Sequence, residues 1–157
     1  MVDERALWNI SAGVYLFTCT DVDGTRPIGR TIDAVSQANT KPAVITMSLH
    51  KGGYTSHVIK PFDHVSLTVL AKDAPMDLIK GFGLRSSKDN DKFAGLEVRH
   101  DAQGAPWVAD AALSQLSCDV KAIRDEGDHL LVLGEVTESQ VLSQGEPMTY
   151  GYYRSLK

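Results

Sequence analysis

Cysteine is scarce in this chain, which has only Cys19 and Cys118 among its 157 residues. The two are far apart and form no C-x-x-C motif, which argues against zinc, rubredoxin-type iron and thioredoxin-type redox sites. They also argue against the disulfide framework of a small secreted domain. Each cysteine lies in an apolar run, so we expect two ordinary core thiols that pack as small hydrophobic side chains.

Long apolar runs and a strong charge bias are also missing. No run approaches the ~20 apolar residues that span a bilayer, and the first residues lack the apolar region of a signal peptide. The 20 acidic and 16 basic residues give a net charge of −4, so nothing attracts the chain generally to nucleic acid or membrane. With no repeat or linker, we expect one cytoplasmic domain over residues 1–157.

Several motifs of catalysis are absent too. The chain has no Walker loop, no G-x-S-x-G elbow and no H-E-x-x-H. Its five histidines show no metal-ligand spacing, so we predict no metal site. Gly81 to Ser86 begins like a dinucleotide fingerprint, but it follows a predicted helix rather than a strand and lacks the last glycine.

What is present is mostly strand signal. Residues 14–20, 27–35, 43–49, 64–69, 116–122 and 129–141 are apolar and β-branched or alternate in hydrophobicity, and turns such as 21–24 and 125–128 separate some of them. Short helices are expected at residues 3–10, 54–60 and 74–81, with Thr55 as the N-cap of the second. So few helices cannot cover both faces of a parallel sheet, which favours a barrel or sandwich.

Two segments carry candidate chemistry. Gly29 to Pro42 is rich in small hydrogen-bonding residues, which suit either an ordinary polar strand end or the lining of a planar, heteroatom-rich ligand. In Ser48 to Thr55 a strand ends, two glycines allow a tight turn and a helix begins next to Lys51. Unpaired N–H groups and a lysine at that place suit a phosphate, although an ordinary capped helix has the same pattern.

These segments and others resemble the flavin reductase-like, FMN-binding split-barrel family. The resemblance runs from Leu7 to about Tyr153, and its elements keep the family's order and spacing. They are Gly13-Val14 with Thr18, Gly29-x-Thr31, Pro42 before Ser48-Leu49, Lys51-x-x-x-Thr55, Val65 to Leu70, Phe82-Gly83, Asp91-Lys92-Phe93, Leu116-x-Cys118, Gly127-Asp128-His129, Gly134-x-Val136 and Glu146-Pro147-Met148.

The resemblance implies an all-β fold, a six-stranded Greek-key split β-barrel with a few short peripheral helices, that forms a homodimer around FMN. The flavin ring is expected along Thr31, Ile32, Asp33, Ala34, Val35, Ser36 and Gln37. The other cofactor-binding residues expected are Ser48, Leu49, His50, Lys51, Tyr54, Thr55 and Lys92. His129 is the family's candidate for contacting the nicotinamide of NADH or NADPH, with a solvent-facing strand residue as the alternative.

The chain departs from the family pattern beside the expected ring. Asp33 and Ala34 replace the usual N-S, and the Asp33 charge would oppose an anionic reduced flavin. Three functions therefore stay open. The first is an NAD(P)H-dependent flavin reductase, the second is a flavoredoxin-like electron carrier that docks a redox protein partner, and the third is a barrel of the pyridoxamine-phosphate-oxidase kind that only binds a ligand.

Overall fold

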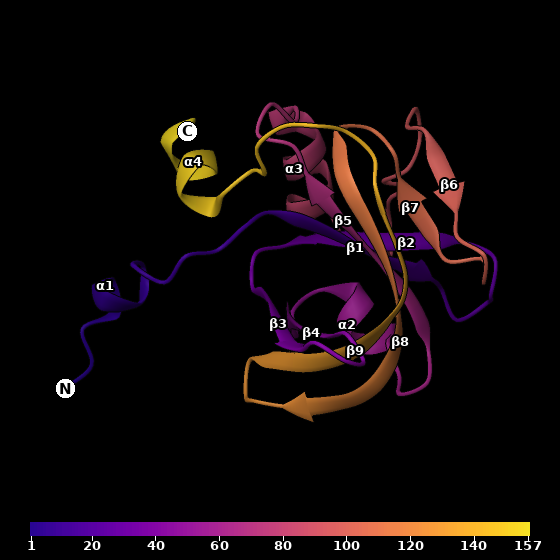
Figure 1. Cartoon of the computed structure of the whole chain (residues 1–157), viewed down its shortest axis with the longest axis horizontal. Helices are drawn as coiled ribbons and strands as arrows, with labels where there is room; N and C mark the ends of the chain where they lie inside the picture. Colours follow the sequence, from indigo (N-terminus) through magenta and orange to yellow (C-terminus); the bar gives the residue numbers. More distant parts are fainter.

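The computed structural model describes all residues, 1–157, and consists mostly of antiparallel β-structure (Figure 1). The strands of the main sheet are β1 (Tyr15–Thr20), β2 (Pro27–Ile32), β3 (Val35–Asn39), β4 (Val44–His50), β5 (His64–Leu70), β8 (Ala112–Asp125) and β9 (His129–Val141). A separate hairpin contains β6 (Val98–His100) and β7 (Pro106–Val108). The helices are α1 (Glu4–Leu7), α2 (Tyr54–Val58), α3 (Met76–Leu84) and α4 (Tyr150–Ser155).

The prediction of a β fold with a few short helices is confirmed, but the strand count of six is not. The main sheet has seven strands in the order β2-β1-β5-β8-β9-β4-β3, and a two-stranded sheet stands apart. Strands β2 and β3 follow each other in the chain yet lie at opposite ends of this order, so no ladder of hydrogen bonds closes the sheet. The long strands β8 and β9 curve strongly (Figure 1).

The extra strands were missed for local reasons. β3 is an edge strand whose side chains are mostly exposed, so its sequence shows no alternation of apolar and polar residues. Strands β6 and β7 have three residues each, too few for a period of two to be seen. Both sets of residues therefore look like loops in the sequence.

Two apolar clusters pack against the sheet. One joins Phe17, Met47 and Leu67 to Val58 and Ile59 at the end of α2. The other contains Leu16, Leu70, Ile79 and Phe82 and lies under α3. Since side chains alternate along β1, its Leu16 and Phe17 enter different clusters, and both faces of this strand are buried.

The two cysteines are buried and unpaired, as the sequence predicted. Cys19 and Cys118 both belong to the cluster that contains Phe17. Burial raises the pKa of each thiol to about 12, so neither supplies a thiolate near neutral pH.

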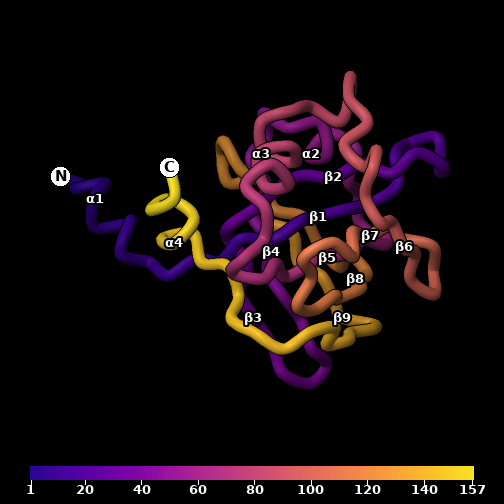
Figure 2. Tube along the Cα trace, turned by 90° about the horizontal axis from the view of Figure 1, so that it is seen from above, coloured from indigo at the N-terminus to yellow at the C-terminus, as the bar shows by residue number.

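The helices differ in detail from the prediction. α1 ends at Leu7, earlier than the expected residue 10, and Ala6, Leu7 and Ile10 are exposed. α1 and α4 lie together at one side of the molecule, away from the sheet, in both views (Figures 1 and 2). The Arg154 guanidinium lies 5.1 Å from the centre of the Trp8 ring and so links the two terminal segments. No helix is long and apolar enough to cross a membrane.

Candidate functional site

A cavity of about 380 Å³ lies where β2, the turn between β4 and α2, and the segment after α3 meet. It contains arginine, lysine, hydroxyl and backbone groups but no aspartate or glutamate. The lining residues are Gly29, Arg30, His50, Gly52, Gly53, Tyr54, Thr55, Phe82, Gly83, Leu84, Arg85, Ser86, Ser87 and Lys92. The wall is therefore cationic.

The turn before α2 is shaped around Arg30. Gly53, not Thr55, is the N-cap of this helix, and no side chain caps it, which corrects the sequence prediction. A Cβ atom on Gly53 would lie 2.1 Å from Nη1 of Arg30, so any other residue here would force the guanidinium to move. Nη1 in turn donates to the carbonyl oxygen of His50 at 2.7 Å.

Two cations in the cavity lack an anionic partner. Nε of Arg30 is buried and has no hydrogen-bond acceptor. Nζ of Lys92 donates to the carbonyl oxygens of Gly29 and Phe82, at 2.9 and 2.8 Å. Burial and then the nearby charge of Arg30 lower the pKa of Lys92 to about 8, and burial also lowers the pKa of Arg30. Positive charge is thus held close together without a counterion, which favours a bound anion.

Thr55 supplies a third group without a partner. Its side chain is buried on the wall of the cavity, and its Oγ1 makes no hydrogen bond. An unpaired buried hydroxyl costs free energy that a ligand oxygen would recover. Arg30, Lys92 and Thr55 therefore form a set of donors that fits a phosphate group.

The remaining residues of the predicted phosphate segment divide into two groups. His50 and Tyr54 line the cavity, and the Tyr54 hydroxyl donates to Oδ1 of Asp21 at 2.9 Å. Ser48 and Leu49 do not line it: Ser48 is half-buried in β4 and Leu49 is fully buried in the core.

Lys51 was expected to hold the phosphate, and the structure places its side chain elsewhere. Nζ of Lys51 lies 2.5 Å from Oδ2 of Asp125 in the hairpin between β8 and β9. Both side chains of this pair are substantially exposed, and Lys51 does not line the cavity. Lys92, which the sequence also predicted, and Arg30, which it did not, line the cavity instead.

Part of the predicted ring segment lines a second, smaller cavity of about 150 Å³. Thr31, Ile32 and Asp33 lie on its wall opposite Tyr150 and Tyr153 of α4. Gly83 and Leu84 line both cavities, so the two are adjacent. The other predicted ring residues are outside both cavities: Ala34 precedes β3, and Val35, Ser36 and Gln37 lie on it, with only Val35 partly buried.

His129 lies next to the first cavity but not on its wall. It pairs with His50 across β9 and β4, and the two rings meet edge to face with their centres 5.0 Å apart. Nδ1 of His129 is 2.7 Å from Oδ1 of Asp128, and this hydrogen bond lowers the pKa of the Asp128 carboxyl. A role for His129 toward a nicotinamide stays a prediction.

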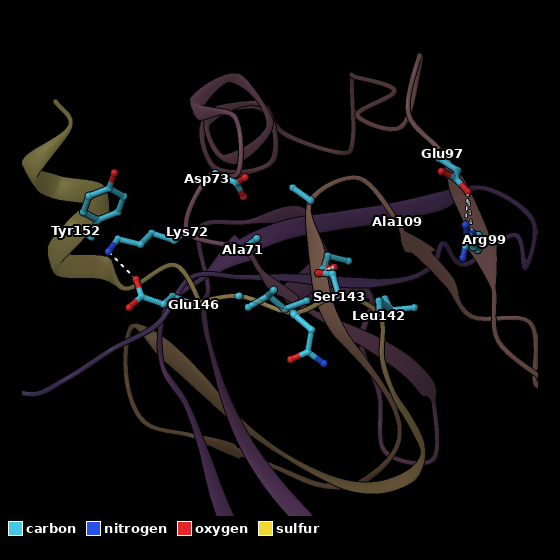
Figure 3. Close-up of a pocket in the computed structure, with 15 residues that line it drawn as sticks. Ala71, Lys72, Asp73, Glu97, Arg99, Ala109, Leu142, Ser143, Glu146 and Tyr152 are labelled. Carbon is cyan, nitrogen blue, oxygen red and sulfur yellow. Dashed lines mark hydrogen bonds and ion pairs between the residues drawn. The ribbon is translucent and has the colours of Figure 1, made fainter.

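The largest cavity, about 730 Å³, shares no residue with the cationic one (Figure 3). Four of its five charged side chains form ion pairs: Lys72 pairs with Glu146 at 2.7 Å and Arg99 with Glu97 at 2.5 Å, while Asp73 is exposed and in no ion pair. No buried polar side-chain atom without a partner lies on its wall. Size alone therefore does not single out a functional site. The cationic cavity differs from this one in having buried donors without a partner.

The fold and the site together define a class: a small antiparallel β protein with a cationic cavity beside a second, more apolar one. The family model described as flavin reductase like domain matches residues 7–157. The chain therefore belongs to the flavin reductase-like family, a family of flavin oxidoreductases.

Individual relatives agree with this assignment. The chain is 35% identical over 156 residues to the high molecular weight rubredoxin of Moorella thermoacetica, covering 99% of this chain and 67% of that protein. It is 32% identical over 156 residues to the ferric-chelate reductase (NAD(P)H) of Archaeoglobus fulgidus, covering 99% and 91%.

A solved structure shows the same fold. It is that of the NADH:FAD oxidoreductase of Streptomyces globisporus in complex with NAD and FAD fragments. The TM-score is 0.83 at 22% identity, over 98% of this chain and 93% of that one.

Proposed function

We propose that this chain binds FMN without a covalent bond and passes electrons from NADH or NADPH through it to an acceptor. The observation that carries the proposal is one cationic cavity in which Arg30 Nε and Thr55 Oγ1 have no hydrogen-bond acceptor and Lys92 has no anionic partner. FMN ends in a single phosphate, and all three residues line the same cavity. The family resemblance also implies a six-stranded split barrel, and this more detailed description of the fold stays a prediction.

The residues of the chain divide the work of binding between the two cavities. Arg30 and Lys92 supply charge-assisted hydrogen bonds to phosphate, and Thr55 supplies a neutral one. The flavin ring fits beside Thr31, Ile32 and Asp33, where backbone groups and α4 border the smaller cavity. FMN, when bound, supplies the hydride and electron chemistry, so the protein needs no general base of its own.

NAD(P)H is proposed as the donor because of the relatives. The Archaeoglobus relative is named as an NAD(P)H enzyme, and the Streptomyces structure contains fragments of NAD and FAD. The expected result is that NADH or NADPH bleaches the visible band of FMN bound to this chain under anaerobic conditions. Stopped-flow absorbance with each nucleotide separately checks this and identifies the preferred donor.

An electron carrier of the flavoredoxin kind is the second candidate. It is favoured by the relative named as a rubredoxin, of which this chain spans two thirds. In that case neither nucleotide bleaches the bound flavin within seconds, while a reduced redox protein does. The same stopped-flow experiment therefore decides between the two.

A homodimer is part of the proposal. Leu7, Trp8 and Ile10 are well exposed on the terminal segment that reaches away from the sheet, and β3 offers an uncovered edge. Exposed apolar side chains gathered in this way are typical of a contact surface. A second copy covering them also borders the ring cavity, because α4 belongs to the same terminal region.

A further inference from the structure

The carboxylate of Asp33 is the acidic group on the wall of the smaller cavity. Asp33 follows the last residue of β2, is half-buried, and forms none of the protein's ion pairs. The other side chains there are apolar or hydroxylated, apart from Lys80 of α3, which is beyond ion-pair distance. A charge in such surroundings acts strongly on whatever occupies the cavity.

Asp33 and Arg30 stand at the two ends of one short stretch of backbone. Three residues of extended chain separate them by roughly 10 Å. A flavin whose phosphate contacts Arg30 and whose ring extends along β2 reaches the cavity that Asp33 borders. The pyrimidine part of the oxidised ring carries an N–H group between two carbonyl groups, and a carboxylate can only accept hydrogen bonds.

We propose that Asp33 sets the reduction potential of the bound flavin, holding it lower than a neutral residue at this position would. The proposal rests on the proposed function, because it requires FMN in these two cavities. Transfer of a hydride from a nicotinamide adds two electrons and one proton to the ring, which thereby gains one negative charge. The Asp33 carboxylate accepts from the N–H of the oxidised ring but repels the added charge of the reduced one.

A lower potential suits a protein that must give its electrons away. Repulsion makes the reduced flavin bind more weakly than the oxidised flavin. The ratio of the two dissociation constants determines how far the potential shifts from that of free FMN. Asp33 is thus a residue that contacts the cofactor and tunes it, and its effect is separate from the phosphate contacts of Arg30 and Lys92.

The test compares dissociation constants for oxidised and reduced FMN in the wild type, Asp33→Asn and Asp33→Ser. Asparagine keeps an acceptor oxygen and removes the charge. In Asp33→Asn, the ratio of the dissociation constant for oxidised FMN to that for reduced FMN should be at least tenfold higher than in the wild type. This corresponds to a positive shift in potential of about 30 mV for a two-electron couple. Asp33→Ser shifts the ratio in the same direction.

Asp73→Asn is the matched control, because Asp73 is exposed, lines the large cavity and loses the same charge. In this control, the ratio of the dissociation constants for oxidised and reduced FMN should equal that of the wild type. An unchanged ratio in both Asp33 variants, with normal binding of oxidised FMN, overturns this inference and leaves the proposed function standing. Failure of the wild type to bind oxidised FMN overturns the proposed function and this inference together.

Discussion

Replacing Arg30 with methionine is expected to weaken FMN binding by about 10- to 150-fold without destabilising the free protein. A hydrogen bond to a charged group contributes roughly 1.5–3 kcal/mol, and each ~1.4 kcal/mol is a factor of ten in affinity. Arg30 has a buried Nε without an acceptor, and burial lowers the pKa of its guanidinium. Removing a poorly compensated buried cation is commonly neutral or stabilising.

Titration calorimetry with FMN and thermal unfolding of the free protein measure the two effects. Lys51→Ala is the control, because the Lys51 ammonium group pairs with Asp125 on the surface. This variant should bind FMN like the wild type. Thr55→Val extends the test to the neutral donor: it should lose affinity and leave the melting temperature equal or higher, because it removes an unpaired hydroxyl. If Arg30→Met binds FMN normally while Lys51→Ala does not, the phosphate contacts Lys51 instead.

FMN affinity is expected to fall about tenfold between pH 7.5 and 9.5 because of Lys92. In the free protein the pKa of Lys92 is about 8, so this side chain loses its charge as the pH passes through that value. A bound phosphate favours the charged form of Lys92. At higher pH, where the free side chain is neutral, binding must therefore take up a proton from the solvent, and this weakens it. Lys92→Met should bind weakly with a flat profile, and Lys92→Arg should bind tightly with a flat profile.

The free protein responds to pH with the opposite sign. The pKa of Lys92 is lowered on folding from 10.5, so between about pH 8 and 10.5 the unfolded chain binds more protons than the folded chain. The Lys92 contribution therefore makes the free protein more stable as the pH rises through this window, and less stable as it falls. The difference in unfolding free energy between wild type and Lys92→Met isolates this contribution.

For the affinity prediction, a pH-independent FMN affinity in the wild type would show that Lys92 does not contact the ligand.

How much of this could be predicted from the sequence depends on how local each feature is. The apolar, β-branched run of β1 and the long final segment of β9 are local patterns, and both strands form as expected. Thr55 was assigned to the phosphate site from its neighbours in the chain, and the structure places it on the cavity wall with a buried hydroxyl that has no hydrogen-bond partner.

Arg30 was missed because nothing near it in the sequence marks it as a ligand. Its proposed role depends on Gly53 and Lys92, which the fold brings to it from other segments. Lys51, by contrast, follows the β4 strand directly and looked suitable, yet its side chain turns toward the β8–β9 hairpin. Sequence neighbours identify the region of the site, whereas the direction of each side chain is fixed by packing between distant segments.

The most direct test of the account compares FMN with riboflavin, which has the same ring and no phosphate. If Arg30, Lys92 and Thr55 hold the phosphate, the wild-type protein should bind FMN at least a hundredfold more tightly than riboflavin, as several charge-assisted hydrogen bonds require. Inorganic phosphate should compete with FMN for the same cavity. Equal affinities for FMN and riboflavin would contradict the phosphate site and, with it, the proposed position of the flavin.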